Sequence, residues 1–292
     1  MSAETTILSC GHEVLDPKQC HYCDYIQDGL IHELMKPKDS EGESRDFSHP
    51  DEFQFILVHQ SCELSFSGYL YELKRAVSAI ERDDYSTGIE CIERCRSWIL
   101  IAARQLQHLV DHLTPQDFAY FRDLLSPASG AESIRFRLIE LSTGLRPDSP
   151  YVSHRGRMYT FREFLDRAPA EGTGRPKTRW WTQAMSEAAE APTLASVFAA
   201  AASRHGGSGE YRDILRDDSL LSALAWSLVK LEKGILSVRK VHLNAARRHI
   251  ADDAGTGHTD GVAYLRAVLE TARCFPELTA AAEKVERKKV QR

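Results

Sequence analysis

The residues best suited to chemistry include an arginine that shares a predicted helix face with an aromatic side chain. Thr114 is a favourable N-cap and Pro115 suits the first helical position, so a helix is predicted to begin here. Phe118 and Arg122 then lie one turn apart on the same face. A guanidinium on an apolar face needs an anion, which is either an internal carboxylate in a structural ion pair or the carboxylate of a bound substrate.

Two histidines are candidates for metal or proton chemistry, because each lies on the apolar stripe of a predicted long helix. His59 follows Phe55 by one turn in a helix predicted over residues 51–82. His242 continues the apolar stripe of a second helix, predicted over residues 217–251. A histidine on such a stripe is usually a hydrogen-bonded core residue, but neutral imidazole is also the commonest protein ligand of heme iron. The residues alone leave both interpretations open.

Four possible soft metal ligands lie close together near the N-terminus: Cys10, His12, Cys20 and Cys23. Thiolate and imidazole are tetrahedral zinc ligands, and a C-x-x-C pair is half of a usual zinc site. The alternative is a set of ordinary reduced cysteines on an N-terminal arm. Asp24 follows the C-x-x-C pair, so the C-x-x-C-H sequence that attaches heme covalently is absent from this segment.

Composition and charge restrict the classes of partner. The 292 residues are 42% hydrophobic, which is enough for a buried core, and the net charge is -5. This charge argues against general binding to nucleic acid or to anionic membranes. Lys230 and Lys233 interrupt the best apolar run, and seven scattered cysteines fit reduced thiols better than a disulfide framework. We therefore expect a cytoplasmic protein with no nucleic-acid or membrane partner.

The periodic segments that must position these residues predict a helical chain. A further helix is predicted from Ser86, as its cap, through Leu109, and another begins at Val262. The segment 144–179 is rich in Pro, Gly and Arg and predicts an irregular excursion with one short helix capped by Thr160. Alanine-rich sequence over residues 180–203 predicts short surface helices.

Three segments carry a resemblance to a known family. The sequence FRDLLSPASG at residues 121–130, followed by Phe136 and Arg137, resembles the signature of the tryptophan 2,3-dioxygenase family, all-helical heme enzymes that open the indole ring with O2. FILVHQSCEL at residues 55–64 is similar to the family's F-x-x-x-H-Q-x-x-E-L helix, although Ser65 stands where the family usually has tryptophan. The loop GTGHTDG at residues 255–261 resembles the family's GTGG-S/T-x-G substrate lid, with His258 and Asp260 in place of small residues.

The resemblance implies a fold, a cofactor and a site. The expected fold is an all-α helical bundle with heme b between long helices. In its R-x-x-H context with Arg239, His242 corresponds to the proximal ligand of the heme iron, and Ser129 corresponds to a residue at the heme edge. On the distal side, the resemblance assigns His59 to the indole N–H. The substrate residues that it implies are Arg122 for the carboxylate, Thr256 for the amino-acid group, and Phe55, Phe118 and a neighbouring subunit's Tyr22, Tyr25 and Ile26 for the indole ring.

The implied organisation is an N-terminal arm, residues 1–36, that reaches a neighbouring subunit, and one helical heme-binding catalytic domain, residues 37–292. A homotetramer, a dimer of dimers, is the family expectation. The expected reaction is C2–C3 dioxygenation of L-tryptophan or a modified, for example methylated, tryptophan to an N-formylkynurenine-type product. The altered lid keeps three alternatives open: an indole monooxygenase that gives a 2-oxindole, a tyrosine hydroxylase, and a non-catalytic heme sensor. A zinc-binding N-terminal module is compatible with each of them.

Overall fold

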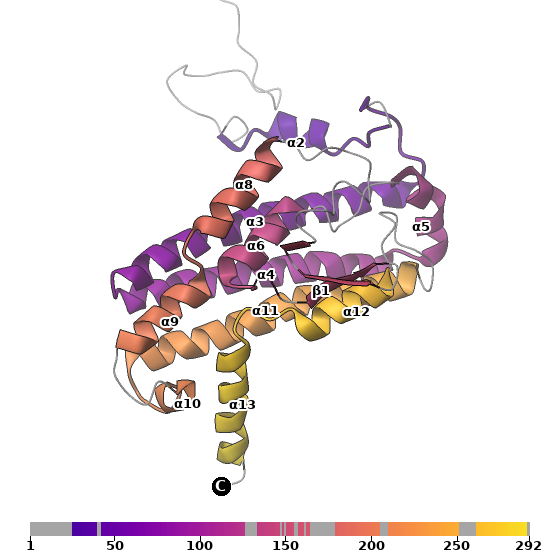
Figure 1. Cartoon of the computed structure of the whole chain (residues 1–292). Coiled ribbons are helices and arrows are strands. Elements are labelled where there is room, and N and C mark those ends of the chain that lie inside the picture. The colour runs from indigo at the N-terminus through magenta and orange to yellow at the C-terminus, as the bar shows by residue number, and fades with distance from the viewer. Residues whose placement is uncertain are drawn as a thin grey trace, which may run out of the picture. The chain divides into compact units, whose positions relative to one another are not determined.

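A computed structural model describes residues 25–39, 42–125, 133–146, 148, 150–154, 157–160, 162–163, 179–204, 210–250 and 261–290. Helices dominate these parts of the chain (Figure 1), which confirms the predicted all-α class. The chain divides into two compact units, residues 1–57 and 58–292, with the boundary inside the long helix α3 (Pro50–Glu81). None of the described helices is both long and apolar enough to cross a membrane.

The first unit contains α2 (Asp28–Leu34) and the start of α3. The buried carboxylate of Glu52 accepts hydrogen bonds from the Ser48 backbone N–H at 2.9 Å and the Ser48 hydroxyl at 3.0 Å, and it also pairs with Arg45. Burial disfavours the charged form, but these partners outweigh it and lower the pKa of Glu52. These hydrogen bonds link the loop that precedes α3 to the first turn of the helix.

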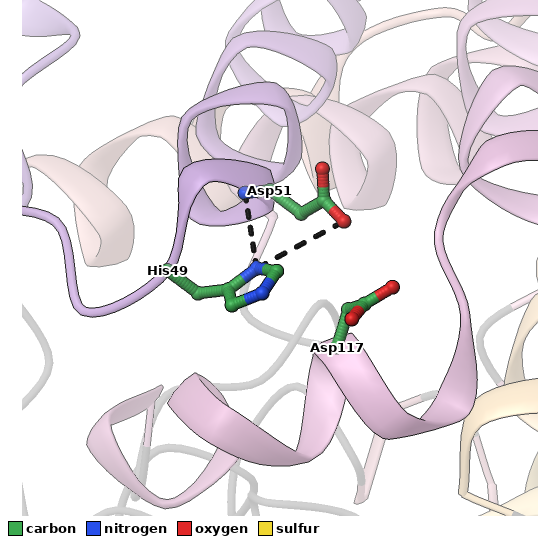
Figure 2. Close-up of side chains that lie close together, drawn as sticks. All are labelled: His49, Asp51 and Asp117. Carbon is green, nitrogen blue, oxygen red and sulfur yellow. Dashed lines mark hydrogen bonds and ion pairs between the residues drawn. The ribbon is translucent and has the colours of Figure 1, made fainter.

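His49 also satisfies the first turn of α3, where backbone N–H groups have no partner within the helix. The Asp51 backbone N–H donates to His49 Nδ1 at 3.2 Å, and the same nitrogen lies 3.9 Å from Asp51 Oδ2 (Figure 2). Asp117, also drawn in Figure 2, belongs to the second unit, where its carboxylate accepts a 2.6 Å hydrogen bond from the Thr114 hydroxyl.

The core of the second unit is built around the two longest helices that lie wholly in it, α4 (Tyr85–His112) and α11 (Leu220–His249). They run side by side (Figure 1). Two glycines permit close packing against α4. A Cβ at Gly234 of α11 would lie 2.9 Å from the Ile99 side chain of α4. A Cβ at Gly68 of α3 would lie 2.5 Å from the Trp98 ring of α4. Both distances are too short for a real contact, so glycine is needed where these helices approach each other.

Three predicted helix starts can be compared with the structure. α5 (Pro115–Arg122) begins as predicted, because the Thr114 hydroxyl accepts the Asp117 N–H at 3.1 Å. The prediction of Ser86 as the cap of α4 is wrong: Asp84 takes that role and accepts from the Thr87 N–H at 3.1 Å. The second long helix is confirmed with slightly narrower bounds, since Ser219 caps α11.

A two-stranded antiparallel sheet interrupts the helical architecture, and the sequence did not predict it. β1 (Pro150–His154) pairs with β2 (Arg157–Thr160) inside the segment expected to be irregular. The predicted cap at Thr160 is confirmed by reciprocal bonds: its hydroxyl accepts the Glu163 N–H at 3.2 Å, and Glu163 Oε2 accepts the Thr160 N–H at 2.9 Å.

Shorter elements complete the second unit. They are the 3-10 helix η1 (Asp123–Leu125) and the helices α6 (Ile134–Thr143), α8 (Arg179–Glu190), α9 (Leu194–Arg204), α10 (Tyr211–Ile214), α12 (Val262–Thr271) and α13 (Pro276–Val290). The predicted helices over residues 180–203 are confirmed as helices. α9 is amphipathic: it buries Leu194, Val197, Phe198 and Ala201 and exposes Ser196, Ala200 and Ser203.

Candidate heme and substrate site

His242 lies in the second half of α11, directly before the buried Leu243. The residue is half-buried, and protein encloses its imidazole closely enough for burial to lower its pKa from 6.5 to about 4, with smaller contributions from His59 and Arg137. The imidazole is therefore neutral at neutral pH and retains a lone pair. A neutral imidazole is the chemical form that an iron ligand requires. The residue thus fits the role of a heme ligand.

His59, which is half-buried on α3, lies close enough to His242 for its charge to act on that residue. Both histidines belong to the second unit, although one lies near the start of the chain and the other near its end. The fold therefore brings together the two histidines that sequence analysis selected on separate helices. A pair of neighbouring imidazoles from two helices can serve one bound group, one as a ligand and one as a hydrogen-bonding partner.

A buried charge cluster holds the turn of α11 that carries His242. Arg239 Nη2 donates to Glu140 Oε1 of α6 at 2.7 Å, and the other terminal nitrogen of Arg239 donates to the Ala272 carbonyl. Glu140 Oε2 also pairs with Arg137 Nη1 at 3.1 Å. All three side chains are at least 95% buried. Burial opposes the charge on Arg239, but the contact with Glu140 outweighs it and raises the arginine pKa.

Arg137 and Arg239 appear in the sequence as parts of motifs, without a predicted structural role. The signal that could have found the local pair is the R-x-x-E spacing of Arg137 and Glu140, which places both on one face of a helix. The partner on α11 is non-local, so the sequence could not identify it. Because Arg239 lies one turn before His242, the cluster fixes the rotation of the helix that presents the imidazole.

Helix α5 presents the predicted substrate residues. Phe118 is buried and packs edge-on against Phe121, with ring centroids 5.4 Å apart at 88°. Arg122 is half-buried at the last position of the helix. The capping hydroxyl of Thr114 and contacts between α5 and α11 position this short helix. The arrangement offers an aromatic wall and a cation one turn apart.

Three further predicted site residues belong to the first unit. Phe55 is half-buried on α3, Ile26 is half-buried, and Tyr25 is 80% exposed. Where the resemblance expected tryptophan, the buried Ser65 donates its hydroxyl to the Ser61 carbonyl at 2.8 Å. The predicted residues that lie outside the described parts are Cys10, His12, Cys20, Tyr22, Cys23, Ser129, Thr256, His258 and Asp260.

Comparison with known proteins identifies the family. The family model for tryptophan 2,3-dioxygenase matches residues 8–188, more than half of the chain. The chain belongs to the tryptophan 2,3-dioxygenase family. A tryptophan 2,3-dioxygenase of Bacillus thuringiensis subsp. konkukian is 27% identical over 301 residues, which cover 94% of this chain and 96% of the relative. The tryptophan 2,3-dioxygenase of Caulobacter vibrioides is 29% identical over 78% of this chain and 87% of its own length. The tryptophan 2,3-dioxygenase of Bradyrhizobium sp. (strain ORS 278) is 30% identical over 78% of this chain and 82% of its own length.

Membership of the tryptophan 2,3-dioxygenase family assigns the chain to the heme-dependent dioxygenases. The chain spans most of the length of these relatives, and the neutral imidazole of His242 suits the cofactor of the family. The described residues therefore fit a heme enzyme.

Proposed function

We propose that this protein inserts both atoms of O2 across the C2–C3 bond of the indole ring of L-tryptophan, or of a ring- or side-chain-modified tryptophan. The product would be of the N-formylkynurenine type. The observation that carries the proposal is the proximity of His59 and His242, from two different helices, in a member of the tryptophan 2,3-dioxygenase family.

His242 would hold the iron of heme b through its neutral imidazole, and Ser129 would contact the heme edge. The bound heme supplies the activation of O2. The Glu140–Arg239 ion pair, one turn away, would keep the imidazole in a fixed orientation. His59 would accept the indole N–H, which sets the position of the ring relative to the oxygen.

The substrate would be held at both of its ends. Arg122 would bind the carboxylate in the bidentate geometry that guanidinium favours, and Thr256 would hydrogen-bond to the amino-acid group. Phe118 and Phe55 would pack against the indole. Fixing C2 and C3 of the ring in this way is the main contribution of the protein, because positioning turns a bimolecular step into a unimolecular one.

We further propose that the chain forms a homotetramer in which residues 1–36 reach a neighbouring subunit. Tyr22, Tyr25 and Ile26 would then complete the aromatic wall of that subunit's site. The 80% exposure of Tyr25 supports this proposal, since an exposed aromatic side chain is available to a second subunit. Deletion of residues 1–36 should weaken tryptophan binding and reduce the assembled mass measured by sedimentation; an unchanged affinity would contradict the exchange.

A zinc ion held by Cys10, His12, Cys20 and Cys23 is a separate proposal for the same arm. The donor set is that of a tetrahedral structural zinc site. Metal analysis of the purified protein should give one zinc per chain, and the Cys20→Ser, Cys23→Ser variant should lose it. Wild-type protein without zinc would refute this part of the proposal.

The reaction is tested by reconstituting the protein anaerobically with ferrous heme, adding L-tryptophan and then O2, and recording optical spectra and product mass together. A product two oxygen atoms heavier than the substrate is expected. A gain of one oxygen atom would instead assign a 2-oxindole-forming monooxygenase. Heme binding with no change in tryptophan, methylated tryptophans or tyrosine would identify a sensor. The His242→Ala variant should lose heme, whereas His108→Ala, at an exposed position of α4, should retain it.

A further inference from the structure

His249, at the end of α11, contacts two backbone carbonyl oxygens with its two ring nitrogens. Nδ1 lies 2.8 Å from the Ala245 oxygen in the preceding turn of α11, and Nε2 lies 2.9 Å from the Leu113 oxygen. Leu113 is the C-cap residue of α4, and 136 positions separate it from the histidine. One side chain therefore joins the carboxyl ends of the two longest helices that lie wholly in the second unit.

The two contacts place the ring between two helix ends. A ring nitrogen that carries a proton donates to a carbonyl oxygen, which can only accept. Both carbonyls lie at helix C-termini, where the helix dipole is negative and favours an N–H donor.

The same ring also contacts the proposed substrate wall. The centroid of His249 lies 5.6 Å from that of Phe118, with the rings at 60°. Its other contact, Leu113, immediately precedes Thr114, the N-cap of α5. His249 thus touches the residue before the α5 cap and an aromatic residue in the first half of the helix. The position of α5 relative to α11 depends on this side chain.

We propose that His249 is a positioning residue of the substrate site: it holds α5 against the end of α11 and so sets Phe118 and Arg122 for the substrate ring and carboxylate. The identity of that substrate rests on the proposed function; the contacts do not. Loss of the ring should therefore weaken tryptophan binding while the binding of heme through His242 is unaffected.

The test measures the dissociation constant of L-tryptophan for the heme-loaded protein by optical titration. His249→Leu removes both ring nitrogens and should weaken binding about tenfold, as expected for loss of a hydrogen bond that positions α5. His249→Arg keeps several N–H donors at the same place, so its affinity should approach that of the wild type. His112→Gln, at an exposed position near the same helix end, is the matched control and should behave as wild type.

Unchanged tryptophan affinity in folded His249→Leu protein would overturn the proposal. Heme affinity, read from the optical spectrum, should be the same in all variants. If His249→Leu fails to fold, His249→Gln and His249→Arg provide the comparison. Wild-type protein that binds no aromatic amino acid would refute the proposed function. The α4–α11 contact would still be tested, because the thermal midpoint of His249→Leu should lie below those of the wild type and His112→Gln.

Discussion

Replacing Glu140 by glutamine is expected to lower the free energy of unfolding by about 3–5 kcal/mol, the usual cost of breaking a buried ion pair from one side. Glu140 is fully buried, with one carboxylate oxygen 2.7 Å from Arg239 and the other 3.1 Å from Arg137. Glutamine preserves the shape but places a neutral amide between two guanidinium groups. This decrease is large compared with a total free energy of unfolding of roughly 5–15 kcal/mol.

Urea unfolding of the heme-free protein, followed by circular dichroism, measures this change. The matched control is Glu93→Gln, which removes a carboxylate that reaches from α4 to Lys230 of α11. Glu93 lies 3.5 Å from Arg96 and 3.7 Å from Lys230, but it is 38% exposed, so its loss should cost less than about 1 kcal/mol. If Glu140→Gln also stays within about 1 kcal/mol of the wild type, the cluster does not hold α6 against α11 and the reasoning is refuted.

A third variant separates charge from packing. Changing Arg137, Glu140 and Arg239 together to methionine removes all three charges and retains apolar bulk. Buried charge clusters replaced in this way are often as stable as the original, so the triple variant should recover much of the loss seen in Glu140→Gln. A triple variant as unstable as the single one would show that shape, and not charge, is what the cluster supplies. The heme affinity of the triple variant then reports how far the cluster orients His242.

Two further predictions concern single residues. Burial lowers the pKa of His242 to about 4, so between about pH 6.5 and pH 4 the unfolded chain binds more protons than the folded one. The free energy of unfolding of the heme-free protein should therefore fall by on the order of 3 kcal/mol as the pH falls through that range. His242→Leu should reduce this pH dependence of the unfolding free energy, and an equal dependence in urea unfolding would contradict the lowered pKa of His242. Gly68→Ala should destabilise the protein by about 1–3 kcal/mol, because its Cβ would lie 2.5 Å from the Trp98 ring. A Trp98→Leu change should relieve part of that cost, and thermal unfolding of the double variant checks it.

Helix existence could be predicted from the sequence because the relevant signals are local. The apolar period that predicted α3 and α11 repeats within each helix, and Thr114 and Ser219 cap their helices through bonds to residues three positions away. The cap of α4 was harder to predict, since Asp84 and Ser86 are both suitable. Asp83 adopts a positive φ of 59° directly after α3, which turns the chain so that Asp84 reaches the first N–H groups of α4.

The elements that the sequence did not predict depend on distant partners. β1 and β2 are short and lie in a stretch rich in Pro, Gly and Arg; they form by pairing with each other, and β1 packs against α12. Leu64 was one of the apolar positions that predicted α3, yet it is 71% exposed. Periodicity identifies a helix and its apolar residues. The buried fraction of each apolar side chain depends on which other elements pack against that helix face.

The three histidines of the site region show why residue type and spacing leave a role open. His59, His242 and His249 all lie on long helices, and local sequence treats the first two alike. Protein burial keeps His242 neutral and therefore able to bind a metal, whereas both ring nitrogens of His249 lie against backbone carbonyl oxygens at two helix ends. The groups that make this difference come from α3, α4 and α6, far away in the chain. A histidine's chemistry here follows from its non-local contacts, so substitutions of those contacts, and not of the histidine alone, are the decisive tests of its role.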